Sequence, residues 1–301
     1  MKYTHIIPMF NYILALLLAP LLNGVINRVK ALFAGRNGPP LLQRYYDIVK
    51  LLRKGTVYGA STSWVFRLSA PVGLAAALVA LLVVPFGGVY APVAFGGDIL
   101  VLAYMLGLMR FFTIIAALDT GSSFEGMGAS REAFFSALAE PALLLGVAAI
   151  ACKTGWMSLS SMLHAASPVS FELLLVVASF IIVYLCENSR IPIDDPATHL
   201  ELTMIHEAMI LDNSGPDLGF IEYSSSLKLW ILGALIVDIA APYRSGLWFV
   251  DCAEGVGCMI LLAAAVGVTE SIMARLRLLR VPQLLAAAGA LSSFALLLVL
   301  R

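Results

Sequence analysis

The chain has 301 residues, of which 60% are hydrophobic and 13% charged, and its 19 basic and 19 acidic side chains cancel to a net charge of zero. Soluble domains contain roughly 45 to 50% apolar and about 25% charged residues, so this composition, with a mean hydropathy of +0.92, argues against a soluble enzyme, a secreted disulfide scaffold and a disordered chain. A pI near 6.9 also argues against a nucleic-acid-binding surface. Most of the surface is therefore expected to face lipid.

Eight stretches are long and apolar enough to cross a bilayer, which takes about 20 residues of helix. The sequence thus predicts an all-α integral membrane protein, a bundle of about eight transmembrane helices forming one polytopic domain over residues 1–301. The first stretch lacks a small-residue cleavage site and is expected to be a retained span, not a signal peptide. The predicted spans are residues 6–29, 66–86, 98–118, 132–152, 169–187, 225–241, 248–270 and 281–300.

The basic residues predict the orientation of these spans, because cytoplasmic segments carry an excess of Lys and Arg. If the segment after the first span is cytoplasmic, 14 of the 19 basic residues lie on the cytoplasmic side and four on the other, with Arg110 inside the third span. Eight spans then place both termini outside. The predicted cytoplasmic segments are long and charged, at about 30–65, 119–131, 188–224 and 271–280.

The first cytoplasmic segment is predicted to hold an amphipathic helix after a Gly-Pro-Pro turn at residues 36–40. Its apolar side chains recur at helical spacing, while polar ones fill the other face. Two compatible interpretations stay open: the helix lies among lipid headgroups, or a soluble subunit docks on it. The residues assigned to docking are Arg36, Tyr45, Asp47 and Lys50.

Glu140 lies deep in the fourth predicted span. It follows Arg131, the end of a predicted small-residue loop at 119–131, by nine residues, which is about 13 Å of helix. Acidic side chains inside a membrane are costly and usually functional. Glu140 is therefore interpreted as either a hydrogen-bonded structural carboxyl or a member of a proton relay. Arg110, also within a span, either extends toward the interface or pairs with a carboxylate such as Glu140.

The segment before the sixth span concentrates acidic residues, eight of them between Glu187 and Glu222. Clustered carboxylates raise one another's pKa, which suits groups that exchange protons near neutral pH. A proton or ion relay is predicted here, with a solvated acidic loop as the alternative, and residues 198–211 are predicted to be helical. The relay candidates in this segment are Glu187, Asp194, His199, Glu201 and Glu207, with Asp238 and Glu270 as further candidates and Arg131 and Arg190 as their charge partners.

The sequence contains no motif for a cofactor or a catalytic nucleophile. His199 and His206 lie two helical turns apart without an HExxH arrangement, and the four cysteines are too scattered for a zinc or iron–sulfur site. No phosphate-binding glycine motif or nucleophile elbow occurs. We therefore expect no metal, no cofactor and no catalytic residue in this chain.

Several motifs, taken together, resemble one family. The chain resembles the NADH:quinone oxidoreductase subunit 1 family of respiratory complex I, and within it the membrane subunits of energy-converting nickel-iron hydrogenases and formate hydrogenlyase. The Asp-Thr-Gly-Ser and Gly-Ala-Ser-Arg-Glu runs favour the hydrogenase branch. The motifs are residues 36–39 (RNGP), 46–50 (YDIVK), 66–67 (FR), 110–112 (RFF), 118–121 (LDTG), 128–132 (GASRE), 140–141 (EP), 187–192 (ENSRIP) and 222–224 (EYS).

The resemblance implies a subunit of the prokaryotic cytoplasmic membrane that couples redox chemistry in a cytoplasmic arm to proton or sodium translocation. The implied partners are hydrogenase-like large and small subunits, iron–sulfur subunits and antiporter-like membrane subunits. Iron–sulfur clusters and a nickel–iron centre would lie in those partners. The alternatives are a quinone-chamber subunit of a complex I-type enzyme, a stand-alone ion transporter and a purely structural anchor.

The chain departs from the family pattern after Asp194. The family places glutamates three, five and seven residues beyond this aspartate, whereas this sequence has Ala197, His199 and Glu201 there. His199 can still shuttle a proton, since its ordinary pKa is near 6.5, whereas Ala197 cannot. A strict copy of the complex I pathway is therefore not expected.

Overall fold

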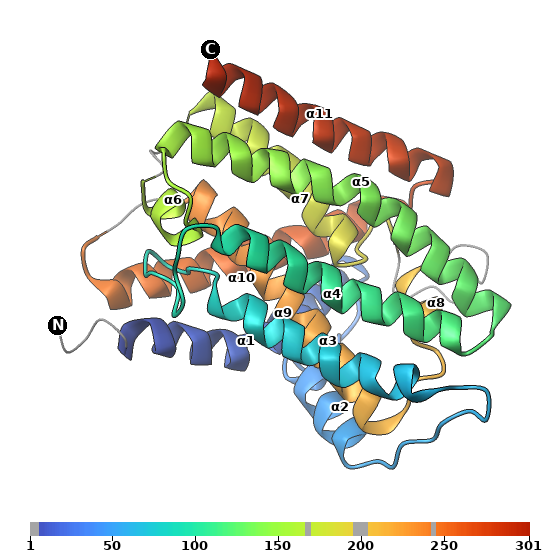
Figure 1. The fold of residues 1–301 in the computed structure, drawn as a ribbon. Coiled ribbons are helices and arrows are strands. Elements are labelled where there is room, and N and C mark those ends of the chain that lie inside the picture. Colours follow the sequence, from blue (N-terminus) through green and yellow to red (C-terminus); the bar gives the residue numbers. More distant parts are fainter. Residues whose placement is uncertain (1–5, 166–169, 195–203, 242–244) are drawn as a thin grey trace.

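The computed structural model describes residues 6–165, 170–194, 204–241 and 245–301. Within these residues the chain is a bundle of helices without β-strands, and one isolated bridge joins Phe86 and Val89 (Figure 1). The prediction of an all-α membrane protein is confirmed. The elements are α1 (Ile6–Phe33), α2 (Gln43–Leu52), α3 (Trp64–Leu82), α4 (Asp98–Asp119), α5 (Ser123–Thr154), α6 (Leu159–Ala165), α7 (Phe171–Glu187), α8 (His206–Met209), α9 (Gly215–Ala240), α10 (Trp248–Ile272), the 3₁₀ turn η1 (Leu278–Arg280) and α11 (Val281–Leu300).

Seven helices in the described part of the chain are long and apolar enough to cross a membrane: α1, α3, α4, α5, α9, α10 and η1–α11 taken together. The remaining predicted span, 169–187, corresponds to α7, which has 17 residues. At 1.5 Å per residue α7 is about 25 Å long, slightly shorter than the hydrocarbon layer of about 30 Å.

Helix α9 lies at the centre of the bundle. Apart from Lys228 and Asp238, its second half is apolar on every side, which is typical of a helix surrounded by other helices, and Leu227, Trp230 and Ile231 are fully buried. It contacts α1, α2, α3, α7 and α10. A charged residue on α9 therefore faces other helices and not lipid.

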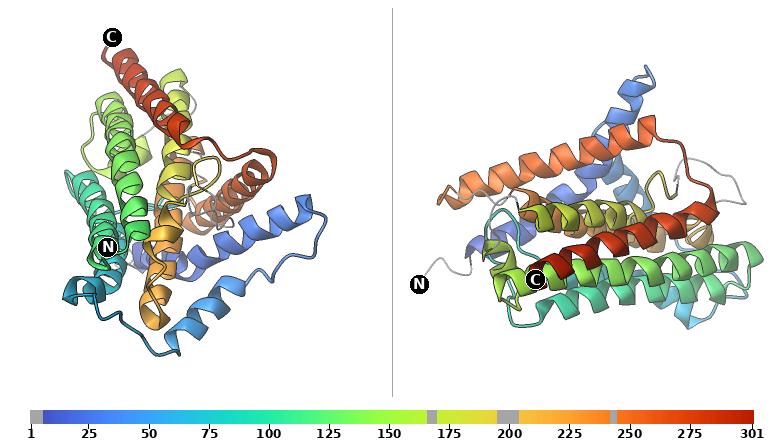
Figure 2. Two further views of the ribbon diagram at one scale, coloured as in Figure 1. Left: turned by 90° about the vertical axis from the view of Figure 1, so that its right-hand side faces the viewer. Right: turned by 90° about the horizontal axis from the view of Figure 1, so that it is seen from above.

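Small residues bring α5, α7 and α11 close together. A Cβ atom on Gly146 of α5 would lie 2.3 Å from the ring of Phe180 on α7 and 3.2 Å from Ser292 Oγ on α11. Ser292 Oγ donates to Ser179 Oγ at 2.8 Å, and Ser179 Oγ donates to the carbonyl oxygen of Ala288 at 2.8 Å. Close backbone approach and hydroxyl hydrogen bonds are the usual means of helix association in lipid. Figure 2 shows α11 lying along α5 and α7.

The prediction of a loop over residues 119–131 is wrong from residue 123 onward, because α5 begins at Ser123. Gly121, with its positive φ, does lie in a turn, but Gly126 and Gly128 lie within α5, where Gly128 permits close packing. A Cβ atom on Gly128 would lie 2.8 Å from the carbonyl oxygen of Ile205 and 3.0 Å from Ala208 Cβ. Tertiary packing against the α8 region thus overrides the weak helix propensity of glycine.

Three further predicted boundaries also change. The helix of the second predicted span ends at Leu82 and not at residue 86, because Pro85 and Gly87, with its positive φ, form a turn. Helix α9 begins at Gly215, ten residues before the predicted span. In the described part of the predicted helix 198–211, only His206–Met209 is helical, since Met204 and Ile205 extend toward α5, where the Met204 carbonyl accepts a bond from Arg131.

Candidate functional site: a charge cluster inside the bundle

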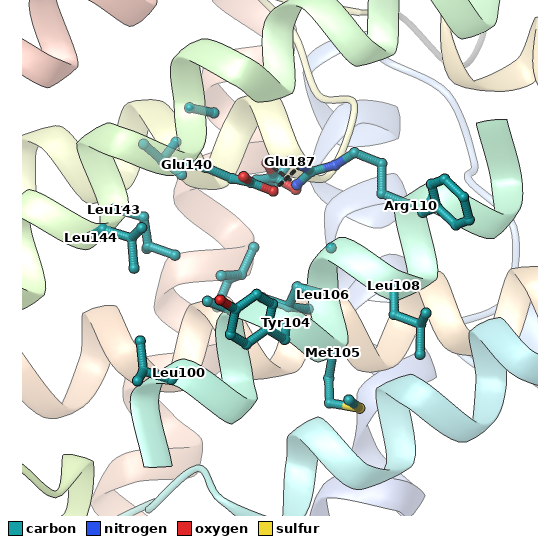
Figure 3. Close-up of a pocket in the computed structure, with 16 residues that line it drawn as sticks. Leu100, Tyr104, Met105, Leu106, Leu108, Arg110, Glu140, Leu143, Leu144 and Glu187 are labelled. Carbon is teal, nitrogen blue, oxygen red and sulfur yellow. Dashed lines mark hydrogen bonds and ion pairs between the residues drawn. The ribbon is translucent and has the colours of Figure 1, made fainter. Parts of the chain in front are cut away.

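Arg110 of α4 joins acidic residues of two other helices. Its Nη1 lies 2.5 Å from Glu140 Oε1 on α5, and its Nη2 lies 2.6 Å from Glu187 Oε1 at the end of α7 (Figure 3). The structure therefore decides between the two interpretations of Arg110, because its guanidinium pairs with carboxylates inside the bundle. Glu140 was correctly named as one of its partners.

Two more charged groups complete this arrangement. Glu132 Oε1 of α5 lies 3.9 Å from Arg110 Nε, and Lys228 Nζ of α9 lies 3.0 Å from Glu187 Oε2. We call these five residues, Arg110, Glu132, Glu140, Glu187 and Lys228, the Arg110 cluster. Three carboxylates share two cations, so the cluster carries one net negative charge when every group is ionised.

The members of the Arg110 cluster differ in exposure. The Glu187 and Arg110 side chains are 7% and 9% exposed, whereas the Glu140 side chain is 48% exposed. An exposed carboxylate such as that of Glu140 would be ordinary on a water-facing surface. Helices α4 and α5, however, are apolar enough to lie in lipid, and an exposed carboxylate is costly there. Glu140 is thus the member of the cluster that is open to the surroundings.

Glu140 opens onto an apolar groove of about 510 Å³ between α4 and α5. Figure 3 shows Glu140, Arg110 and Glu187 at one side of this groove, opposite Leu100 and Tyr104. The inner lining includes Val183 of α7 and Leu232 of α9. The groove therefore passes between two helices and reaches the core.

A second cavity, of about 250 Å³ and lined mostly by polar groups, lies beside the Arg110 cluster. Asn188, which follows Glu187, lines it, and so does Ser225, one helical turn before Lys228. We call it the polar cavity; its other lining residues are Asn23, Asn27, Lys30, Arg44, Ser189, Arg190, Asp194, His206, Glu207, Ile221 and Glu222.

Ion pairs cross-link the walls of the polar cavity. The side chain of Glu270, on α10, is fully buried and lies 2.7 Å from Lys30 Nζ and 3.4 Å from Arg190 Nη1. Arg190 also donates to Asn23 Oδ1, and Arg44 of α2 pairs with Glu222 of α9. Burial lowers the pKa of Arg44 to about 10.

Asp194 contacts the start of α8. Its carboxylate lies 2.9 Å from Arg275 Nη2 and accepts a hydrogen bond from the His206 amide at 3.2 Å. Arg131, predicted to be a charge partner of the acids, donates from Nη1 to the Met204 carbonyl at 2.9 Å. Burial lowers the pKa of the His206 imidazole below its ordinary value, so the ring is neutral at pH 7.

A different group of acids lies at the end of the bundle where α4 and α10 begin, which we call the Asp98 end. Asp98 is fully buried, and its two oxygens accept bonds from Ser158 Oγ and the Leu159 amide, each at 2.7 Å. Asp251 accepts bonds from the amide and hydroxyl of Ser245 at 2.7 and 2.6 Å. Asp238, a predicted relay residue, also lies here and accepts a bond from the Gly87 amide at 3.1 Å.

The remaining predicted relay and docking residues lie outside the Arg110 cluster. Glu207 lines the polar cavity, and His199 and Glu201 lie outside the described residues. The four proposed docking residues lie on or near α2: Arg36 and Lys50 are exposed, Tyr45 donates to the Leu17 carbonyl, and Asp47 accepts a bond from Gln43 Nε2 at 2.8 Å.

The sequence predicts no individual site role for Glu132, Lys228 or Arg275, nor for Asn23, Arg44 and Glu222 of the polar cavity. Lys228 interrupts an apolar span, and that position alone marks it as a candidate. For the other residues nothing local distinguishes an inward from an outward side chain. Among the described residues, no three His, Cys, Asp or Glu side chains are grouped so that they could hold a metal ion.

Comparisons with known proteins agree with this architecture. The family model described as NADH dehydrogenase matches residues 6–300. Formate hydrogenlyase subunit 4 of Escherichia coli (strain K12) is 30% identical over 281 residues, covering 90% of this chain and 91% of that protein. Hydrogenase-4 component C of the same organism is 31% identical over 246 residues, covering 80% and 76%.

More distant matches extend the same pattern. A subunit of the NADH-quinone oxidoreductase of Wolbachia pipientis wMel is 30% identical over 198 residues, covering 58% of each chain. A chain in the structure of the membrane-bound sulfane sulfur reductase, an archaeal respiratory membrane complex, superposes with a TM-score of 0.83 over 98% of both chains, at 17% identity. The family match spans nearly the whole chain and includes every helix of the bundle, so this multi-pass membrane protein belongs to the NADH dehydrogenase family.

Proposed function

We propose that this chain is the membrane-embedded coupling subunit of a hydrogenase-type, formate hydrogenlyase-like complex, in which it links redox chemistry in a cytoplasmic arm to proton or sodium translocation. The observation that carries the proposal is the Arg110 cluster, a group of buried and half-buried ionisable side chains from four helices at membrane depth. Intramembrane ionisable groups of this kind are typical of ion pathways. The similarity to formate hydrogenlyase subunit 4 and hydrogenase-4 component C supports the type of complex.

The charge count of the Arg110 cluster suits it to hold a single transferable proton. With three carboxylates and two cations, the uptake of one proton brings the cluster from one net negative charge to neutrality. An uncompensated charge is costly in a low-dielectric interior, so the cluster is stabilised by accepting that proton. Glu140 is the best-placed acceptor because its side chain is the most exposed of the three acids.

The polar cavity supplies a continuation of this route. Glu187 and Lys228 of the cluster are next to, or one turn from, residues that line the cavity. Within the cavity, Asp194, Glu207 and Glu222 lie among basic partners. In this proposal a proton passes between the polar cavity and Glu187 and Glu140 by way of the ionisable groups of these two neighbouring regions.

The same proposal assigns the surroundings of the chain. The polar cavity and α2 lie on the cytoplasmic side of a prokaryotic cytoplasmic membrane, with both termini outside. The redox arm, with its large, small and iron–sulfur subunits, docks near Arg36, Tyr45, Asp47 and Lys50, while antiporter-like subunits contact the chain within the membrane. The iron–sulfur clusters and the nickel–iron centre belong to those partners.

The substitution Glu140→Gln tests this function in the assembled complex. We expect redox turnover to be at least partly retained and ion uptake per turnover to fall several-fold, because an amide cannot carry a transferable proton at this position. The measurement compares acidification or sodium uptake with redox rate in sealed vesicles.

Glu172→Gln is the matched control. Glu172 also pairs with a lysine, Lys153, at 2.9 Å, but it lies at the opposite end of α7 from Glu187. Its ratio of ion uptake to redox turnover should stay at the wild-type level. A wild-type ratio in Glu140→Gln would exclude Glu140 from the relay.

A further inference from the structure

We infer that the groove between α4 and α5 is the docking site of a transmembrane helix from a second membrane subunit, and that this helix presents one hydrogen-bond donor to Glu140. The inference goes beyond the proposed function, which does not specify where a membrane partner sits. It rests on the proposed function only in assuming that the chain works within a complex.

The first argument is the incomplete pairing of Glu140. Oε1 of its carboxylate is paired with Arg110 at 2.5 Å, whereas Oε2 has no hydrogen-bond or ion-pair partner among the residues that the structure describes. The side chain is 48% exposed and lines the groove. A charged carboxylate facing hydrocarbon is costly when one of its oxygens has no donor. A donor from outside this chain would remove that cost.

The second argument is charge complementarity. The Arg110 cluster has three carboxylates for two cations, so its open side is electronegative. A donor group on the facing surface, basic or neutral, is attracted there. A lipid acyl chain has no such group, and its headgroup lies at the interface and not at the depth of Glu140, near the middle of α5.

The third argument is the shape of the α4 surface beside the groove. Leu100, Tyr104 and Phe111 recur at spacings of four and seven residues, so they share one face of α4, and they are 55%, 73% and 56% exposed. Gly107 lies between them, and a Cβ atom there would come within 3.8 Å of Glu140 Oε1. The missing side chain leaves room for a facing helix to approach Glu140 closely.

Photo-crosslinking from inside the groove tests the inference in the intact complex. The photoreactive residue p-benzoylphenylalanine replaces Tyr104 in one variant and Leu144 of α5, another groove residue, in a second. After irradiation of native membranes we expect a covalent adduct with one and the same second membrane subunit from both positions. Loss of that one subunit from the purified complex, with this chain retained, would support the inference equally.

The control position is Leu261 on α10. It is 69% exposed, and α10 contacts α1 and α9 instead of bordering the groove. Labelling of lipid alone from Tyr104 and Leu144 in an assembled, active complex would overturn the inference, as would the same adducts from Leu261. Neither result depends on ion translocation. The crosslinking test can therefore overturn the docking site while the Glu140→Gln test supports the proposed function, and the Glu140→Gln test can fail while crosslinking supports the docking site.

Discussion

The Arg110 cluster and the Asp98 end use acidic residues in two different ways. At the Asp98 end, carboxylate oxygens accept bonds from backbone amides and serine hydroxyls, and so hold a loop or the start of a helix in place. In the Arg110 cluster, carboxylates share the basic groups of Arg110 and Lys228. Depth in an apolar chain therefore does not by itself separate these acids; the kind of partner does, and only the acids that pair with basic groups belong to the relay that we propose.

Asp238 illustrates the difference. It was predicted as a relay residue for the same reason as Glu140, namely its position in an apolar span. The structure places it at the Asp98 end, where it accepts a bond from the Gly87 amide, apart from the Arg110 cluster. That Asp238 takes part in a relay stays a prediction, and the relay proposed for the Arg110 cluster does not depend on it.

The largest expected effect comes from removing the central cation of the cluster. Arg110→Ala leaves Glu132, Glu140 and Glu187 with Lys228 as the sole cation of the cluster. Breaking a buried ion pair in this way typically costs about 3 to 5 kcal/mol. We expect a loss of assembled complex or a clear fall in its Tm, together with loss of ion uptake, measured on detergent-solubilised complex and in vesicles.

Arg110→Lys is the companion variant. It keeps the charge but cannot reach Glu140 and Glu187 with two separate nitrogens, so an intermediate result is expected. Normal stability of Arg110→Ala would mean that the cluster is not the electrostatic centre of this region.

A smaller and qualitatively different effect is expected from Asp98→Asn. The amide keeps one acceptor, which can serve the Leu159 amide, and turns the other oxygen into a donor, so the Ser158 hydroxyl can no longer donate to it and must reorient to accept. The two bonds to a charged acceptor thereby become bonds to a neutral amide, at a cost of about 1 to 3 kcal/mol. The Tm should fall, while the ratio of ion uptake to redox turnover in the surviving complex stays unchanged. An altered ratio with an unchanged Tm would remove the distinction between the two regions.

The smallest effect is a pH dependence from His206, beside the polar cavity. Because burial lowers the pKa of His206 while the unfolded value is near 6.5, the unfolded state binds the extra proton. The native state thus loses stability as the pH falls below about 6.5 toward the lowered value, with no effect above that window. On acidification, the Tm of the His206→Gln variant should fall less than the Tm of the wild type.

His164 at the Asp98 end provides the control for that measurement. It is exposed and stacks on Tyr90 with ring centroids 5.5 Å apart. His164→Gln should therefore leave the acid-induced change in Tm at the wild-type size. Equal responses of the two variants would contradict a specific contribution from His206.

Much of the fold could be predicted because lipid selects strongly on local composition. Runs of about 20 apolar residues have few alternatives to a membrane helix, so the predicted spans match the observed helices to within several residues, apart from α5 and α9, which begin nine and ten residues earlier. Local rules failed where packing decides. Gly126 and Gly128 resemble turn residues, yet both lie within α5, and at Gly128 the backbone of Ile205 approaches the helix closely.

The sequence by itself determined that this is a bundle of apolar helices with a small set of acids and bases at costly positions, because hydropathy and charge are properties of local segments. It thereby named Arg110, Glu140 and Glu187 as candidates for a relay and its charge partners. Only the tertiary structure decided that Glu187 joins Arg110 to Lys228, that Asp238 lies elsewhere and that Glu140 opens onto a groove. Those pairings connect residues 30 to 77 positions apart on different helices, and their geometry depends on how whole helices pack, which no local pattern encodes.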